Sequence, residues 1–171
     1  MAGALIPVQD EKVIGAICDA NVLIDYARAD EALIADLVGF WGRVYVPDIV
    51  LREVRQLPRE RAEALGLIIL ETPLSLPEAR SLSFQDRACL HFVIENGWTC
   101  IANDRRLRDE CTNRGRKTVW GLEMLLKMVS AGRITPTRAR DAATRIRSDN
   151  PLITEVILAD FLRQLDDLDR R

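Results

Sequence analysis

Short β-rich runs alternate with amphipathic segments along most of the chain, and this alternation strongly limits the folds open to it. The expected strands span residues 13–18, 44–46, 67–70, 99–102 and 118–120. The expected helices span residues 22–28, 31–41, 49–57, 84–95, 105–114 and 122–131. Strands and helices in alternation predict an α/β fold: a mainly parallel sheet of five strands flanked by helices.

The pattern changes after Gly132, where no further strand is expected. Thr135 and Pro136 provide an N-cap and a first-turn proline, and residues 149–151 interrupt the resulting helix. The last expected helix carries an apolar stripe of Leu158, Phe161, Leu162, Leu165 and Leu168. We expect one structural domain, formed by a sheet region at residues 1–132 and a helical extension at residues 133–171. The extension either packs on the sheet region or contacts a partner.

Composition excludes several classes of protein. With 171 residues, of which 48% are hydrophobic and 29% charged, the chain is expected to fold as a globular domain. No apolar run reaches the length of a membrane span, and the first twelve residues lack the features of a secretory leader. We therefore expect a cytoplasmic protein with no membrane partner.

Cysteine and histidine usage directs attention to carboxylates. Four cysteines are widely spaced without a CxxC pair, which argues against a zinc knuckle or a thioredoxin motif. His91 is the only histidine, so mechanisms that need two imidazoles are excluded. Acidic side chains remain as the main candidates for catalysis or metal binding.

The positive charge of the chain is carried almost entirely by arginine. The net charge is −2, and only three of the 24 basic residues are lysines (Lys12, Lys117 and Lys127). Arginines gather at residues 52–61, 105–117 and 138–147. Their planar side chains suit bidentate contact with phosphate, but for each cluster taken alone a solvated helix face with i,i+4 ion pairs is the favoured explanation.

Four acids are predicted to face one site. Asp19 and Asp104 follow expected strands, so both would lie at the carboxyl edge of a parallel sheet, where ligands gather. On helical wheels, Glu53 falls between Ile49 and Leu57, and Asp86 falls among Cys89, Leu90 and Val93. Both side chains are therefore predicted to point inward. Asp25, by contrast, is predicted to be solvated.

Several carboxylates that converge on a core need compensation. Their burial is costly and their mutual repulsion raises their pKa values, unless they share a cation. Oxygen ligands alone favour Mg²⁺ or Mn²⁺. Each acid also has a structural alternative: Asp104 as a helix N-cap, Ser83 and Asp86 as a capping box, and Asn21 as the cap of the helix at 22–28.

In order and spacing, four segments of the chain resemble PIN-domain ribonucleases, and most of all the VapC-type toxins of toxin–antitoxin pairs. These segments are CDANVLID, VPDIVLREV, LSFQDRACL, and IANDRRLRDEC followed by GRKTVWG. The resemblance implies that Mg²⁺ or Mn²⁺ is bound by Asp19, Glu53, Asp86 and Asp104, and that Asn21 supports Asp19. It also implies the strand order 3-2-1-4-5 and frequent homodimers.

The activity implied is metal-dependent endoribonuclease cleavage of RNA, with a cognate antitoxin as a possible protein partner. Water activated by one or two metal ions would attack a phosphodiester, while Arg105, Arg106 and Arg108 would hold neighbouring phosphates. One departure is Ala102, at a position where many family members have threonine or serine. The hydroxyl missing there would contact a ligand carboxylate or the phosphate.

Two other functions compete with this one. The first is a PIN-like binding module that has kept its acids but acts through its arginines or its last helix. The second is a haloacid-dehalogenase-like phosphatase, because DANV is similar to the DxDxT/V opening of those enzymes. Asn21 stands where their second aspartate transfers a proton, and an amide cannot do so, which makes the phosphatase the weaker hypothesis.

Overall fold

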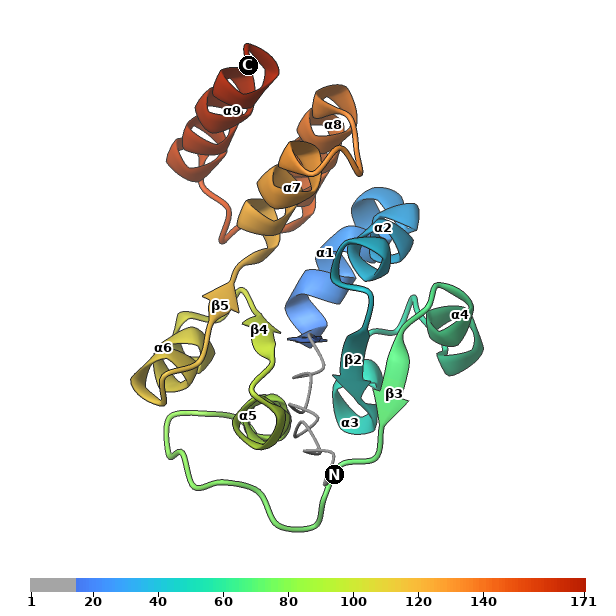
Figure 1. Cartoon of the computed structure of the whole chain (residues 1–171), viewed down its shortest axis with the longest axis vertical. Coiled ribbons are helices and arrows are strands. Elements are labelled where there is room, and N and C mark those ends of the chain that lie inside the picture. Colours follow the sequence, from blue (N-terminus) through green and yellow to red (C-terminus); the bar gives the residue numbers. More distant parts are fainter. Residues whose placement is uncertain (1–14) are drawn as a thin grey trace, which may run out of the picture.

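The computed structural model describes residues 15–171, and its strands and helices alternate as predicted (Figure 1). The strands are β1 (Ala16–Cys18), β2 (Val44–Pro47), β3 (Ile68–Leu70), β4 (Thr99–Ile101) and β5 (Thr118–Val119). The first helices are α1 (Ala20–Asp30), α2 (Ala32–Trp41), α3 (Asp48–Leu51), α4 (Arg59–Ala64) and α5 (Phe84–Asn96). The later ones are α6 (Arg105–Asn113), α7 (Gly121–Ser130), α8 (Pro136–Asp149) and α9 (Glu155–Asp169). Residues 13 and 14 of the first expected strand lie outside the described residues.

The five strands form one parallel sheet in the order β3-β2-β1-β4-β5. This confirms the α/β prediction, and the order is the one that the resemblance implied. Ile17 of β1 lies opposite Tyr45 on one side and Cys100 on the other. The strand order reverses between β1 and β4, and such a reversal opens a crevice at the carboxyl ends of the strands. Asp19 and Asp104 follow these two strands.

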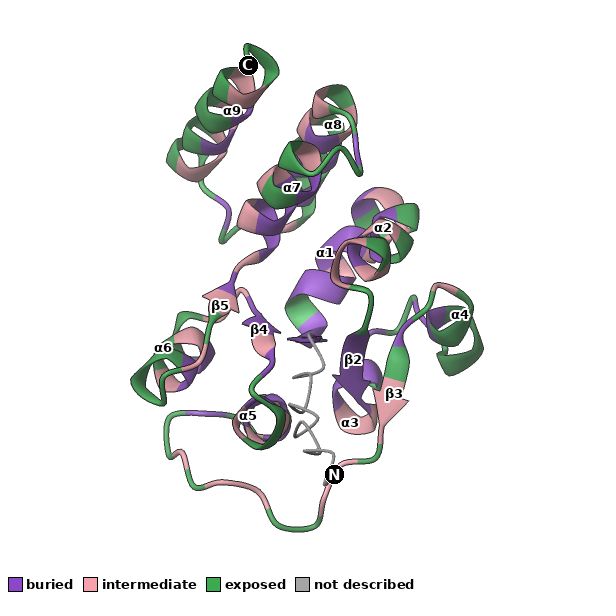
Figure 2. Cartoon of the chain, viewed as in Figure 1, coloured by how far each residue is buried: buried purple, intermediate pink, exposed green. Residues whose placement is uncertain are grey.

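Helices cover both faces of the sheet (Figure 1). On one face, α5 packs against β1, β2 and β4 and contacts α6; α1, α2 and α7 form the layer on the other face. Strands β1 and β2 are entirely buried, while the outer surfaces of α6, α8 and α9 are exposed (Figure 2). Because β1 and β2 are buried on both faces, their sequences are continuous apolar runs without alternating polar residues. Within residues 15–171, no helix has both the length and the apolar character that crossing a membrane requires.

The structure differs from the predicted helices at two places between residues 48 and 64. The expected helix at 49–57 ends after one turn, because i→i+3 hydrogen bonds from Val54 to Leu51 and from Leu57 to Val54 replace the α-helical pattern. Helix α4 was not expected, since Ala62 is its only buried residue and it therefore lacks apolar periodicity.

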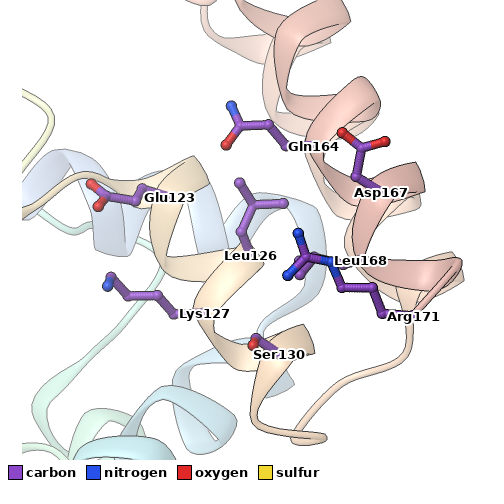
Figure 3. A pocket seen from close by; sticks show the side chains of 8 residues that line it. All are labelled: Glu123, Leu126, Lys127, Ser130, Gln164, Asp167, Leu168 and Arg171. Atoms are coloured by element: carbon purple, nitrogen blue, oxygen red, sulfur yellow. The ribbon is translucent and has the colours of Figure 1, made fainter.

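The helical extension packs on the sheet region. α8 lies against α1 and α7, and α9 lies against α7 and α8. Beside this contact, a hollow of about 370 Å³ separates α7 from the C-terminal end of α9 (Figure 3). Lys127 and Glu123 line it from α7, and Asp167 and Arg171 from the other side. The hollow contains none of the predicted metal ligands.

Arginines of the extension pair with acids of the same chain. Arg138 bonds Asp30 at the end of α1 and Asp36 on α2, both at 2.7 Å, and Arg145 donates to the carbonyl of Ala29 at 2.9 Å. Arg140 pairs with Asp166 of α9. The cluster at residues 138–147 therefore has a structural use, which was the alternative to phosphate binding.

Replacing Arg138 with alanine is expected to lower the free energy of unfolding by about 1–2 kcal/mol, because two partly buried carboxylates lose a charged donor. Arg163→Ala is the matched control, since within residues 15–171 the ion pair of Arg163 is with Asp160 on an exposed face of α9. Urea titration of both variants measures the difference. An equal, negligible cost for the two substitutions would show that Arg138 does not hold the extension.

Candidate functional site

Asp19 lies at the centre of the carboxyl edge of the sheet and is only 3% exposed. One carboxylate oxygen accepts a 2.9 Å hydrogen bond from the N–H of Val22, which makes Asp19 the N-cap of α1. The other accepts a 3.2 Å bond from the N–H of Asn103. Neither donor carries a formal charge. Burial raises the pKa of Asp19 to about 7, and the charges of Asp86 and Asp25 act in the same direction.

Asp104 lies just after β4, the strand beside β1, and caps α6. Its carboxylate accepts from the N–H of Arg106 at 2.8 Å, and the Arg106 guanidinium lies 3.4 Å from its second oxygen. Partial burial raises the pKa of Asp104, but the hydrogen bonds and charge of Arg106 outweigh it, so the pKa is lowered. The capping alternative is thus confirmed for Asp104. Capping occupies one oxygen and leaves the other to arginine or to a cation.

Asp86 lies in the first turn of α5, half-buried beside these two acids. Ser83 caps the helix through the N–H of Asp86 at 3.2 Å. The pKa of Asp86 is raised by burial and then by the charges of Asp104 and Glu53. These electrostatic effects connect all four predicted acids, since Asp86 in turn raises the pKa of Asp19.

The predicted orientation of Glu53 is wrong, because its side chain is exposed. Successive i→i+3 turns advance about 120° per residue rather than 100°, so Leu51, Val54 and Leu57 face the core and Glu53 turns outward. Glu53 remains close enough for its charge to act on Asp86. It therefore lies at the rim of the acidic site instead of on its floor.

Asn103 organises the site and was not singled out from the sequence. Its N–H donates to Asp19, its side-chain oxygen accepts from the N–H of Gly121 at 2.9 Å, and its amide donates to Asp25 at 3.1 Å. One residue thereby connects the ends of β1 and β4 with the start of α7. The only available signal was its place directly before Asp104, at the end of an expected strand.

Asp25 is buried, at 8% exposure, whereas the sequence predicted a solvated side chain. The reason is the extension: Asn150, after α8, donates to Oδ2 of Asp25 at 3.1 Å, the same oxygen that accepts from Asn103. Burial raises the pKa of Asp25, against the effect of the Asn150 hydrogen bond. A helical wheel of α1 alone cannot show that a residue more than 100 positions later in the chain packs over Asp25.

The three arginines predicted to contact phosphate differ in placement. Arg105 and Arg106 are exposed, and Arg105 lies 3.6 Å from Asp109. Arg108 instead turns inward, donates to the carbonyls of Ala102 and Asn103 at 3.0 and 2.8 Å, and lies over the ring of Trp120. Arg105 and Arg106 thus remain open to a ligand, and Arg108 braces the loop that carries Asp104.

Asn21 and Ala102 occupy different surroundings. Asn21 is exposed next to Asp19, but the second hydrogen bond to Asp19 comes from Asn103. Ala102 is completely buried, and its carbonyl accepts from Arg108. The support that the resemblance assigned to Asn21 therefore has a structural counterpart in Asn103.

The donor chemistry of the site fits a hard divalent cation. Asp19, Asp86 and Asp104 provide carboxylate oxygens, as Mg²⁺ and Mn²⁺ prefer. A buried carboxylate that is held only by backbone N–H groups is also a position that a cation would stabilise. Across residues 15–171, no three His, Cys, Asp or Glu side chains already stand close enough together to hold a metal ion. Closing the acids around an ion would require Arg106 to release Asp104.

Comparison of the chain with protein-family models, curated proteins and solved structures found no match. The class defined by the structure is an α/β protein with a parallel sheet and an acidic site at the carboxyl edge of that sheet.

Proposed function

We propose that this protein is a metal-dependent endoribonuclease that hydrolyses phosphodiester bonds of RNA. One observation carries the proposal: three half-buried or buried acids, with a fourth at the rim, lie near enough for their charges to interact, where the strand order of the sheet reverses. Burial, and then the charges of the neighbouring acids, raise the pKa values of Asp19 and Asp86, so ionising the metal-free site is unfavourable. Such an arrangement is costly unless it serves a ligand.

Each residue has a role in this reaction. Asp19, Asp86 and Asp104 would hold Mg²⁺ or Mn²⁺, with Glu53 at the rim, and the cation would activate a water and stabilise charge on the leaving oxygen. Asn103 orients Asp19 through its N–H. Arg105 and Arg106 extend from the first turn of α6, where exposed guanidinium groups and the helix N-terminus both attract phosphate. The preference for RNA over DNA rests on the resemblance to PIN-domain ribonucleases.

The proposal extends to partners. The resemblance to VapC-type toxins supports a role as the toxin of a type II toxin–antitoxin pair, with a protein antitoxin and a homodimeric assembly in the cytoplasm. Size-exclusion chromatography with light scattering tests the dimer. A PIN-like binding module is the competing outcome, in which RNA is bound but not cleaved.

Cleavage of labelled single-stranded RNA is expected with Mg²⁺ or Mn²⁺ and not with excess EDTA. Asp104→Asn should lower the rate about 100-fold, on the scale set by losing one preorganised charged group. Asparagine is as good an N-cap as aspartate, so α6 should stay intact. Asp141→Asn, an exposed change on α8, is the control. Cleavage that continues in EDTA, or that survives Asp104→Asn unchanged, would refute the proposal.

A further inference from the structure

A cavity of about 480 Å³ adjoins the acidic site. The sheet region contributes Asp104, Arg108 and Trp120 to its lining, and the extension contributes Leu152, Ile153 and Ile157. Its size lies within the range of small-molecule sites. Because Asp104 lines the cavity, an RNA strand bound at the acidic site would pass the opening of the cavity.

The cavity has an aromatic wall and an apolar wall. The Arg108 guanidinium lies 5.9 Å from the centre of the Trp120 ring, and two backbone carbonyls fix it there. Leu152, in the turn between α8 and α9, is 80% exposed, although it lines the cavity. Flat aromatic and guanidinium surfaces with apolar neighbours are the surfaces on which unpaired bases stack.

The charges around the cavity disfavour a phosphate inside it. Asp25, Asp104 and Asp149 contribute carboxylates, against guanidinium groups from Arg28 and Arg108. Carboxylate oxygens accept hydrogen bonds, and they match the exocyclic amino group of a nucleobase. The polar lining therefore suits the base of a nucleotide better than its phosphate.

We propose that this cavity binds one unpaired, amino-bearing base of the RNA, next to the phosphodiester that is cleaved at the acidic site. The inference rests on the proposed ribonuclease function and adds a specificity site built by the extension. Trp120 provides the stacking surface, and the turn that carries Leu152 closes the opposite side. Uracil has no exocyclic amino group and should be disfavoured at this position.

The test uses short single-stranded RNAs in which 2-aminopurine, a fluorescent base with an amino group, replaces each base in turn. Protein is mixed in excess with the RNA. Stacking is monitored as a loss of 2-aminopurine fluorescence, and cleavage is measured on the same samples. One position beside the cleaved bond should be quenched. Trp120→Leu should abolish that quenching and weaken binding about tenfold.

Controls separate stacking from folding. Trp41→Leu makes the same change at the far end of α2 and should leave the quenching intact. Leu152→Ser alters an exposed side chain without a folding cost, and it should reduce the quenching and relax the discrimination against uracil. Two outcomes would overturn the base site alone. In the first, RNA is cleaved but no position is quenched; in the second, RNA is cleaved and the quenching is unaffected by Trp120→Leu and Leu152→Ser. RNA that is neither bound nor cleaved would overturn the proposed function, and the base site with it.

Discussion

Asp19→Asn is expected to stabilise the metal-free protein at neutral and alkaline pH while abolishing its metal-dependent cleavage of RNA. The pKa of Asp19 is raised from 3.8 to about 7 in the folded protein. Between these values the native state keeps a proton that the unfolded state has lost, so raising the pH favours unfolding. This loss of stability amounts to about 1.4 kcal/mol per pH unit over that window.

Urea titrations of wild type and Asp19→Asn in EDTA measure this effect. From about pH 5 to about pH 8, the free energy of unfolding of the variant relative to wild type should rise by about 3 kcal/mol. Comparing two pH values cancels any packing cost of the asparagine. Asp141→Asn removes the same formal charge from an exposed site on α8 and should show no such change.

Divalent metal should offset most of this difference in stability. At about 100 times its dissociation constant, Mg²⁺ or Mn²⁺ should stabilise the wild type by about 2.7 kcal/mol and leave the variant unchanged. The variant should also fail to cut RNA. Equal responses of the two proteins to pH and to metal would mean that Asp19 is simply a helix cap.

The framework of the fold was predictable from the sequence, because strands buried on both faces and amphipathic helices leave strong local patterns. Asp19 and Asp104 were placed correctly at one sheet edge for the same reason, since each directly follows the end of a strand. The capping role of Asp104 was also visible in the sequence as an alternative. For α1 the suggested cap, Asn21, was wrong, because the helix begins at Ala20 and Asp19 caps it. Local pattern was sufficient wherever the secondary structure was regular.

The errors have identifiable physical causes. Glu53 was misplaced because a helical wheel assumes 100° per residue, and the chain there forms three-residue turns. Asp25 was misplaced because Asn150, far along the chain, supplies the contact that buries it. Asn103 was overlooked because its importance comes from the hydrogen bonds it makes to Asp19, Asp25 and Gly121, and three-dimensional proximity leaves no spacing pattern. The site therefore depends on the extension more than the sequence indicated.

Asp25→Leu is expected to lower the free energy of unfolding by about 3 kcal/mol and to weaken RNA cleavage at the same time. The substitution leaves the partly buried side-chain amides of Asn103 and Asn150 without their shared acceptor, and a buried donor without a partner costs about 1–3 kcal/mol. Asn103 also orients Asp19, so a disturbance at Asp25 should pass to the acidic site. Cleavage should fall by about 10- to 100-fold, as for partners that orient metal ligands.

Asp25→Asn separates these effects, because it keeps one side-chain oxygen that both amides can approach and removes a charge that burial disfavours. Its stability should stay within about 1 kcal/mol of the wild type, and Asp141→Leu provides the control for an exposed site. Hydrogen exchange should show lower protection of α8 in Asp25→Leu only, because the bond from Asn150 connects the end of that helix to α1. If Asp25→Leu instead left the protection of α8 and the cleavage rate unchanged, the extension would pack on the sheet region without supporting the site.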